Sequence, residues 1–167
     1  MQRSETSRCR ASLLKFCNGN GVDLGHGGDP IQPSAVTVDL PRPYAAVGLH
    51  PTNLEGDATS LYWFKDACLD YVYSSHLLED FIDTRKVLIE WLRVLKVGGH
   101  LALYCPDEQR FRKHCAVSGQ ELNLAHKHAD FSLVKVKTIL STLNCVHIWE
   151  RDVTVDYSWE LVSVKRG

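Results

Sequence analysis

Short apolar runs alternate along the chain with segments whose apolar residues recur at helical spacing. This alternation is typical of βαβ units, in which helices join the strands of a parallel sheet. The apolar runs that we interpret as strands are residues 21–24, 35–39, 69–74 and 100–105. The sequence therefore predicts an α/β fold.

The clearest helical pattern follows the third of these strands. Its apolar residues form one stripe, which consists of Val87, Leu88, Trp91, Leu92 and Leu95. Either Asp83 or Thr84 can cap the N-terminus of this helix. We expect Gly98-Gly99 to end the helix and Lys96 to lie in its last turn, where a cation suits the helix dipole.

The segments outside this region are less regular. Shorter helices are predicted over residues 5–17 and 132–143, whereas the polar stretch 107–131 has no clear assignment. The chain ends with two predicted strands, 145–150 and 157–165, which can pair as an antiparallel hairpin. A purely doubly wound dinucleotide fold would more often end on βα units, so this hairpin points to a mixed sheet.

The composition is that of a single globular domain. The chain has 167 residues, 44% of them apolar, and a formal net charge of -1, which does not indicate a nucleic-acid or membrane surface. No apolar run reaches the roughly 18 residues of a spanning helix, and the N-terminus does not resemble a secretory signal. The six cysteines include no C-x-x-C pair, which favours a reducing compartment. We expect a cytoplasmic protein that binds neither nucleic acid nor membrane.

The most informative motif is Asp23-Leu24-Gly25-His26-Gly27-Gly28, where a strand runs directly into closely spaced glycines. Glycine lets the backbone turn tightly and approach a ligand closely. In open α/β sheets, ligands bind at the carboxyl ends of the strands, which is where this turn lies. Taken alone, the motif fits equally well a turn that has no ligand.

The residues around this turn do not match the common phosphate-binding patterns. The dinucleotide pattern G-x-G-x-x-G needs glycine where the chain has Pro30, and the G-K-[ST] of a P-loop is absent. An NAD-type oxidoreductase is therefore disfavoured. A ligand with a ribose but no phosphate fits better, because Asp39 can accept hydrogen bonds from ribose hydroxyls. Asp57 could face an adenine amine, although both carboxylates also fit ordinary surface or turn positions.

Five stretches of the sequence belong together by order and spacing. They are 22–29 (VDLGHGGD), 38–39 (VD), 56–58 (GDA), 69–81 (LDYVYSSHLLEDF) and 92–101 (LRVLKVGGHL). Jointly they resemble the class I S-adenosylmethionine-dependent methyltransferases, in particular the type 11 group. The resemblance covers about residues 20–105 and concerns the cofactor rather than the acceptor.

The resemblance implies a Rossmann-like three-layer αβα sandwich with a seven-stranded mixed sheet whose last strand is antiparallel. It also implies S-adenosyl-L-methionine as the cofactor. We expect a single methyltransferase domain over residues 1–167. This domain would comprise an N-terminal helical segment (1–17), a cofactor-binding half (20–105) and an acceptor-side half (106–167).

By position, the resemblance assigns these residues to the cofactor: Asp23, Gly25, His26, Gly27, Asp39, Asp57, Ala58 and Ser74. The glycine turn would hold the methionine part with help from Asp23. Asp39 would bind the ribose, Asp57 and Ala58 would contact the adenine edge, and Ser74 would border both cofactor and acceptor. Two positions depart from the family pattern. Asp29 stands where a third glycine is common, and Asp80 where many relatives have histidine.

Histidines are the candidates for chemistry on the acceptor. His76 follows the fourth strand of the resemblance, and His126-Lys127-His128-Ala129-Asp130 follows the fifth. In an extended segment His126, His128 and Asp130 would face the same way. They could form a general base, acceptor contacts, a metal site or a simple polar loop. We name His76, His126 and His128 as catalytic candidates and expect no metal.

Methyl transfer itself demands few side chains, because the enzyme mainly aligns the acceptor with the methyl group. A base is needed only for a poor nucleophile such as a hydroxyl. The sequence thus predicts O- or N-methylation of a small molecule or glycan, with homodimer formation left open. The alternative is a catalytically idle S-adenosylmethionine-binding domain that acts through a partner protein.

Overall fold

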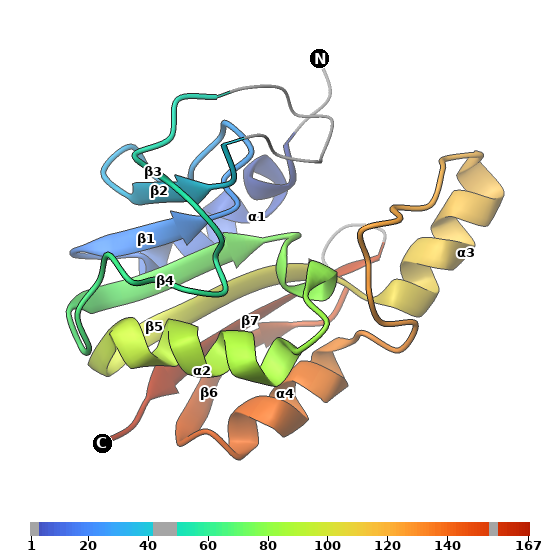
Figure 1. Cartoon of the computed structure of the whole chain (residues 1–167). Helices are drawn as coiled ribbons and strands as arrows, with labels where there is room; N and C mark the ends of the chain where they lie inside the picture. The colour runs from blue at the N-terminus through green and yellow to red at the C-terminus, as the bar shows by residue number, and fades with distance from the viewer. Residues whose placement is uncertain (1–3, 42–49, 154–156) are drawn as a thin grey trace.

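The strands form one mixed sheet in the order β3-β2-β1-β4-β5-β7-β6 (Figure 1). This computed structural model describes residues 4–41, 50–153 and 157–167. The strands are β1 (Gly21–Leu24), β2 (Val36–Asp39), β3 (Leu54–Glu55), β4 (Leu69–Ser75), β5 (Leu95–Pro106), β6 (Cys145–Arg151) and β7 (Ser158–Lys165). Strands β1 to β5 pair in parallel, whereas β7 is antiparallel to both β5 and β6. The predicted α/β fold with an antiparallel last strand is confirmed.

Helices cover the two faces of this sheet unequally. The helices are α1 (Glu5–Leu13), α2 (Thr84–Val94), α3 (Glu108–Ser118) and α4 (Leu133–Ser141), with short 3-10 turns η1 (Leu14–Phe16) and η2 (Leu78–Asp80). In Figure 1, α2 and α4 lie in front of the sheet and α1 lies behind it. Helix α3 stands beyond the carboxyl ends of β1 and β4 (Figure 1).

Two connections on the β3 side of the sheet lack the helices that usually join parallel strands. Residues 25–35, between β1 and β2, and residues 56–68, between β3 and β4, are described throughout and contain turns but no helix. Ile31 of the first connection is buried together with Cys9 and Leu13 of α1 against Tyr71 and Tyr73 of the sheet. Helix α1 therefore helps to cover the face that a helix after β1 would otherwise cover.

The predicted helix α2 is confirmed, with Asp83 as its N-cap accepting a hydrogen bond from the Lys86 amide. Its C-terminal end was predicted wrongly. The helix stops at Val94, and Leu95 has extended backbone that enters β5 directly. Lys96 therefore lies in a strand, where its Nζ donates to Asp70 Oδ1 at 2.7 Å. Pairing of β5 with β4 from Leu95 onward thus outweighs the local preference of residues 95–97 for another helical turn.

The remaining elements agree with the sequence-based prediction to different degrees. The terminal hairpin and α4, which Ser132 caps, are confirmed. Helix α3 was missed because it has little apolar pattern. Of its apolar residues only Phe111 and Cys115 are buried, although Asp107 caps its start and Gly119 ends it in a left-handed conformation with φ of 75°. Within the described residues, no helix is long and apolar enough to cross a membrane.

Helix α2 anchors the connection between β3 and β4. Trp91 is fully buried and its Nε1 donates to the Ala58 carbonyl at 2.8 Å. The Arg93 guanidinium donates to the Leu61 and Phe64 carbonyls, both at 3.1 Å. These bonds replace the backbone hydrogen bonds that a helix would have provided in this segment.

We predict that Trp91→Phe destabilises the protein. Phenylalanine retains most of the apolar burial but leaves the Ala58 carbonyl without this donor, at a cost of about 1–3 kcal/mol. Urea unfolding followed by circular dichroism measures the free energy of unfolding. Tyr62→Phe, at an exposed side chain in the same connection, is the control and should change it little. Equal stability of the two variants would contradict the anchoring role of Trp91.

Candidate functional site

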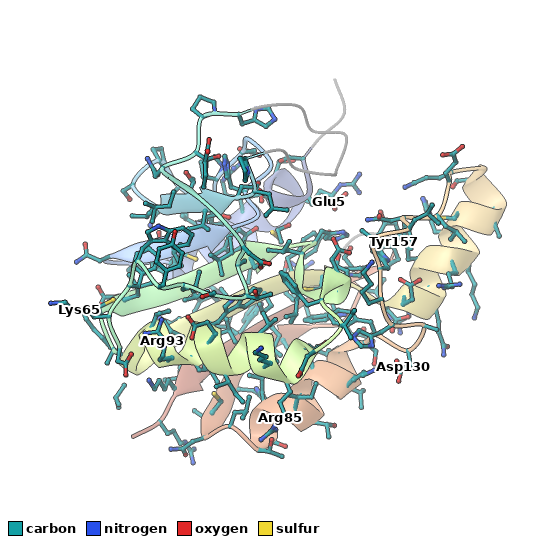
Figure 2. All side chains as sticks on the ribbon, viewed as in Figure 1. Glu5, Lys65, Arg85, Arg93, Asp130 and Tyr157 are labelled. Carbon is teal, nitrogen blue, oxygen red and sulfur yellow. The ribbon has the colours of Figure 1, made fainter. Side chains whose placement is uncertain are left out.

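A cavity of about 880 Å³ lies at the carboxyl ends of β1, β2 and β4. Its walls come from the glycine turn after β1, from η2, from the start of α1 and from the segment between α3 and α4. Figure 2 labels Glu5 and Tyr157 at this end of the sheet, whereas Lys65 lies at the opposite end. The position agrees with the rule that open α/β sheets bind ligands at the carboxyl ends of their strands.

Most of the residues assigned to the cofactor line this cavity. They are Gly25, His26, Gly27, Asp39, Asp57 and Ala58. Asp23 and Ser74 are not part of the lining that the described residues form. Tertiary structure thus brings three separate segments of the prediction to one cavity, and the individual roles stay predictions.

The turn at Gly25 requires glycine for two reasons. Its φ is 69°, and a Cβ at this position would lie 2.9 Å from Leu77 Cδ2. The Gly25 amide donates to the Val38 carbonyl at 2.9 Å, which ties the turn to β2. A side chain here would therefore both strain the backbone and fill the space between the turn and Leu77.

His26 holds the turn in shape rather than serving as a free base. The Gly28 amide donates to His26 Nδ1 at 3.1 Å, so the proton of the neutral ring is on Nε2. That Nε2 lies 3.0 Å from Thr52 Oγ1, to which it donates. Partial burial lowers the pKa of His26, which keeps the ring neutral.

Asp23 stabilises the segment that follows the same turn. Its Oδ2 accepts a hydrogen bond from the Ile31 amide at 2.6 Å, and its Oδ1 has no hydrogen-bond partner. Complete burial raises the pKa of Asp23 to about 7. The carboxyl therefore positions the segment after the glycines and does not itself reach the cavity.

Asp29, which departs from the family pattern, links the turn to α1. Its carboxylate accepts hydrogen bonds from Ser4 Oγ and, at 2.5 Å, from Arg10 Nη2. Arg10 also donates to the Pro30 and Ile31 carbonyls. The helix at the N-terminus is thus clamped onto the turn, and residues 4–6 at its start form part of the cavity wall.

The two carboxylates of the predicted ribose and adenine sites lie on neighbouring segments. The Gly56 amide donates to the Asp39 carbonyl at 2.8 Å, which places Asp57 beside the end of β2. The Asp39 carboxylate accepts from the Leu40 amide, and Asp57 Oδ1 accepts from the Thr59 amide, both at 2.8 Å. These local bonds hold each side chain at the cavity edge.

The neighbouring serine takes the place expected for Ser74. Ser74 is fully buried, and its Oγ donates to the Leu24 carbonyl at 3.1 Å. Ser75 lines the cavity, and its buried Oγ has no hydrogen-bond partner. Because side chains alternate along a strand, only one of these adjacent serines can face the ligand, and the sequence does not show which.

His76 lies at the end of β4 on the cavity wall, in a left-handed conformation with φ of 49°. Its Nε2 lies 3.1 Å from Ser158 Oγ, and its Nδ1 lies 3.8 Å from Glu79 Oε1. Burial lowers the pKa of His76 to about 3. The ring is therefore neutral at physiological pH.

A buried carboxyl that the sequence did not indicate lies between two of the predicted histidines. Glu79 is 1% exposed and its carboxyl accepts no hydrogen bond. His126 Nε2 lies 3.8 Å from the same Oε1 that faces His76. On its other side, His126 Nδ1 lies 2.6 Å from Glu108 Oε2. Burial raises the pKa of Glu79 well above its usual range.

His128 lies apart from this group. Its Nε2 is 2.9 Å from the Phe81 carbonyl and 3.3 Å from Thr84 Oγ1, at the start of α2. Asp130 is exposed and pairs with Lys135. The segment turns at residues 124–125 and 129–130 instead of running extended, so the prediction that His126, His128 and Asp130 share one face is wrong. The described residues contain no group of three or more potential ligands arranged for a metal ion.

Comparisons with known proteins agree with the geometry. Residues 31–103 match the family model described as a methyltransferase domain. No curated protein sequence matches the chain.

Three solved structures illustrate the likeness in fold. A Bacillus halodurans protein described as a methyltransferase is 16% identical, with a TM-score of 0.71, and the match covers 95% of this chain and 99% of that one. An Archaeoglobus fulgidus S-adenosylmethionine-dependent methyltransferase is 15% identical, with a TM-score of 0.69 and coverages of 96% and 92%. A chain from the complex of the Haloferax volcanii Trm112 methyltransferase activator with a methyltransferase is 14% identical, with a TM-score of 0.69 and coverages of 98% and 90%.

The family match and the solved neighbours bear out the resemblance that the sequence motifs indicated. They also agree with S-adenosyl-L-methionine as the cofactor of this kind of domain. The antiparallel seventh strand of the sheet is also the one expected for that fold. The chain is a class I methyltransferase-fold protein whose residues 31–103 match the methyltransferase domain family.

Proposed function

We propose that this protein is an S-adenosylmethionine-dependent methyltransferase that acts on a small molecule or glycan. The observation that carries the proposal is one continuous cavity. Six of the predicted cofactor residues line it, and so do His76, His126 and Tyr157. Cofactor and acceptor could therefore meet without a change of fold.

The glycine turn and the charge of the lining fit this cofactor. Four carboxylates, Glu5, Asp39, Asp57 and Asp80, line the cavity, whereas Lys127 supplies the cationic side chain of its described lining. An acidic lining favours a ligand with a sulfonium and an ammonium group and disfavours the pyrophosphate of NAD. When bound, the cofactor would supply an electrophilic methyl group.

The chain's own residues would bind and orient this ligand. Asp39 would accept hydrogen bonds from the ribose hydroxyls, and Asp57 with Ala58 would contact the adenine. Gly25 and Gly27 would let the backbone approach the methionine part closely. His76 and His126 are the proposed catalytic residues at the acceptor end. His128 lies outside the cavity lining, so its contribution would be to hold the segment against α2.

The second candidate function is that of a cofactor-binding domain that acts with a partner protein. The observation that favours it is the Haloferax volcanii neighbour, which is a chain from a complex with a methyltransferase activator. Binding of the cofactor without turnover would distinguish this candidate from an autonomous enzyme.

We predict that Asp39→Ala weakens the affinity for S-adenosylmethionine by at least about ten-fold, or about 1.4 kcal/mol, because the ribose loses its acceptor. Isothermal titration calorimetry with S-adenosylmethionine and S-adenosylhomocysteine measures the effect. Asp130→Ala removes an exposed carboxylate outside the cavity and is the matched control. Unchanged affinity of Asp39→Ala would mean that the ribose site is misplaced, and absence of binding to the unmodified protein would refute the proposed cofactor.

A second prediction concerns turnover. We expect S-adenosylhomocysteine to accumulate when the protein is incubated with S-adenosylmethionine and a panel of small alcohols, phenols, amines and glycans. Mass spectrometry should detect an acceptor that is 14 Da heavier, the mass of the methylene gained when a methyl group replaces a proton. A cofactor that binds but is never consumed, across the panel and with no added protein, would favour the partner-dependent candidate.

A further inference from the structure

We propose that the acceptor is a hydroxyl group, that His126 takes its proton, and that Glu108 is the residue that positions His126 for this step. The proposal rests on the proposed methyltransferase function. The proposal adds that the methylated atom is an oxygen. It also assigns a role to Glu108, which lies in the stretch 107–131 that had no clear assignment from the sequence.

The contact between His126 and Glu108 determines which ring nitrogen is basic. His126 Nδ1 lies 2.6 Å from Glu108 Oε2. The second oxygen of Glu108 accepts a hydrogen bond from Arg112 Nε at 2.7 Å. A carboxylate paired with a guanidinium only accepts hydrogen bonds, so Nδ1 carries the proton of the neutral imidazole and Nε2 carries the lone pair.

The surroundings hold the ring in one orientation. The His126 and Phe111 rings lie with their centroids 4.9 Å apart. The adjacent Lys127 amide donates to the Glu79 carbonyl at 3.0 Å, which fixes the segment to η2. The His126 side chain is 4% exposed and nevertheless lines the cavity. A base fixed in this way would lose little entropy when it engages a hydroxyl.

Among the described residues, no hydrogen-bond donor contacts His126 Nε2, so its lone pair is available to accept a proton. The nearest acid, Glu79 Oε1, lies 3.8 Å away, which is too far for a direct hydrogen bond. Burial raises the pKa of Glu79, which disfavours its charged form. In the part of the chain that the structure describes, other titratable or charged groups also surround Glu79, His76 and His126. They include Glu108 and Arg112 on α3, Asp80 on η2, Glu5 and Arg8 on α1, Tyr104 and Cys105 on β5, Lys127 and Tyr157.

A base in this position matters for a hydroxyl more than for an amine. A neutral amine already has a nucleophilic lone pair, whereas a hydroxyl gains nucleophilicity as its proton departs. The hydroxyl oxygen would form a bond to the methyl carbon as the carbon–sulfur bond breaks, and the electron pair of the broken bond would remain on sulfur. The hydroxyl proton moves to His126 Nε2, and Glu108 stabilises the resulting imidazolium by its negative charge.

The first test uses the ligand-free protein and therefore does not depend on turnover. Nitrogen-15 NMR of the histidine side chains should show His126 with its proton on Nδ1. Glu108→Gln should weaken this tautomer preference, because an amide, unlike a carboxylate, can also donate a hydrogen bond to Nδ1. Glu121→Gln, the same change at an exposed residue outside the cavity, should leave it unchanged. A proton on Nε2 of His126 in the unmodified protein, or a tautomer preference that Glu108→Gln leaves unchanged, would overturn the proposal.

The second test measures methylation of a hydroxyl acceptor found in the panel. His126→Gln should lower kcat by about 100-fold while the affinity for S-adenosylmethionine, measured by calorimetry, stays within two-fold. Glu108→Gln should lower kcat by about ten-fold and move the acidic limb of the pH profile to lower pH, whereas Glu121→Gln should do neither.

The outcomes separate this proposal from the one on which it rests. Loss of S-adenosylmethionine binding in the unmodified protein would refute the methyltransferase function itself. Normal cofactor binding with turnover of amines alone, or hydroxyl methylation that His126→Gln leaves intact, would refute only the role of His126. If Glu108→Gln lowered kcat without shifting the pH profile, the proposed positioning role of Glu108 would be refuted, and its role would be to stabilise α3.

Discussion

Parallel pairing of β1 with both β2 and β4 is the constraint on which the site depends. It brings the carboxyl ends of three strands to one edge of the sheet, and a residue of the cavity wall ends or directly follows each strand. Gly25 follows β1, Asp39 ends β2 and His76 follows β4. The hydrogen bond from the Gly25 amide to the Val38 carbonyl then fixes the turn against β2. Without this register the three residues would not share a cavity.

The half of the sheet that carries the cofactor site is built with few helices. Turns replace helices in residues 25–35 and 56–68, and other parts of the chain stabilise them. Helix α1 clamps the first connection through the pair of Arg10 and Asp29, and α2 holds the second through Trp91. At Asp29, where the family commonly has glycine, the side chain is a partner of α1.

Prediction from the sequence succeeded where the signal was local and strong. The apolar stripe and cap of α2, the glycine turn and the terminal hairpin were all correct. It failed where tertiary context overrode local preference, as at Lys96, which lies in β5 because sheet pairing begins directly after Val94. It also failed for α3, whose ends carry ordinary caps but whose few buried residues give no periodic pattern. Asp130 does not join His126 and His128, because the chain turns at residues 129–130 and leaves its side chain exposed.

The sequence by itself determined the α/β class, the position of the glycine turn, and the presence of Asp39 and Asp57 after the strands next to it. These features depend on backbone preferences and periodicity within a few residues. Only the tertiary structure decided that Ser75 rather than Ser74 faces the cavity, and that Glu79 lies between His76 and His126 with Glu108 behind. The reason is physical: those contacts join η2, α3 and the segment before α4, whose distances are set by packing and not by spacing along the chain.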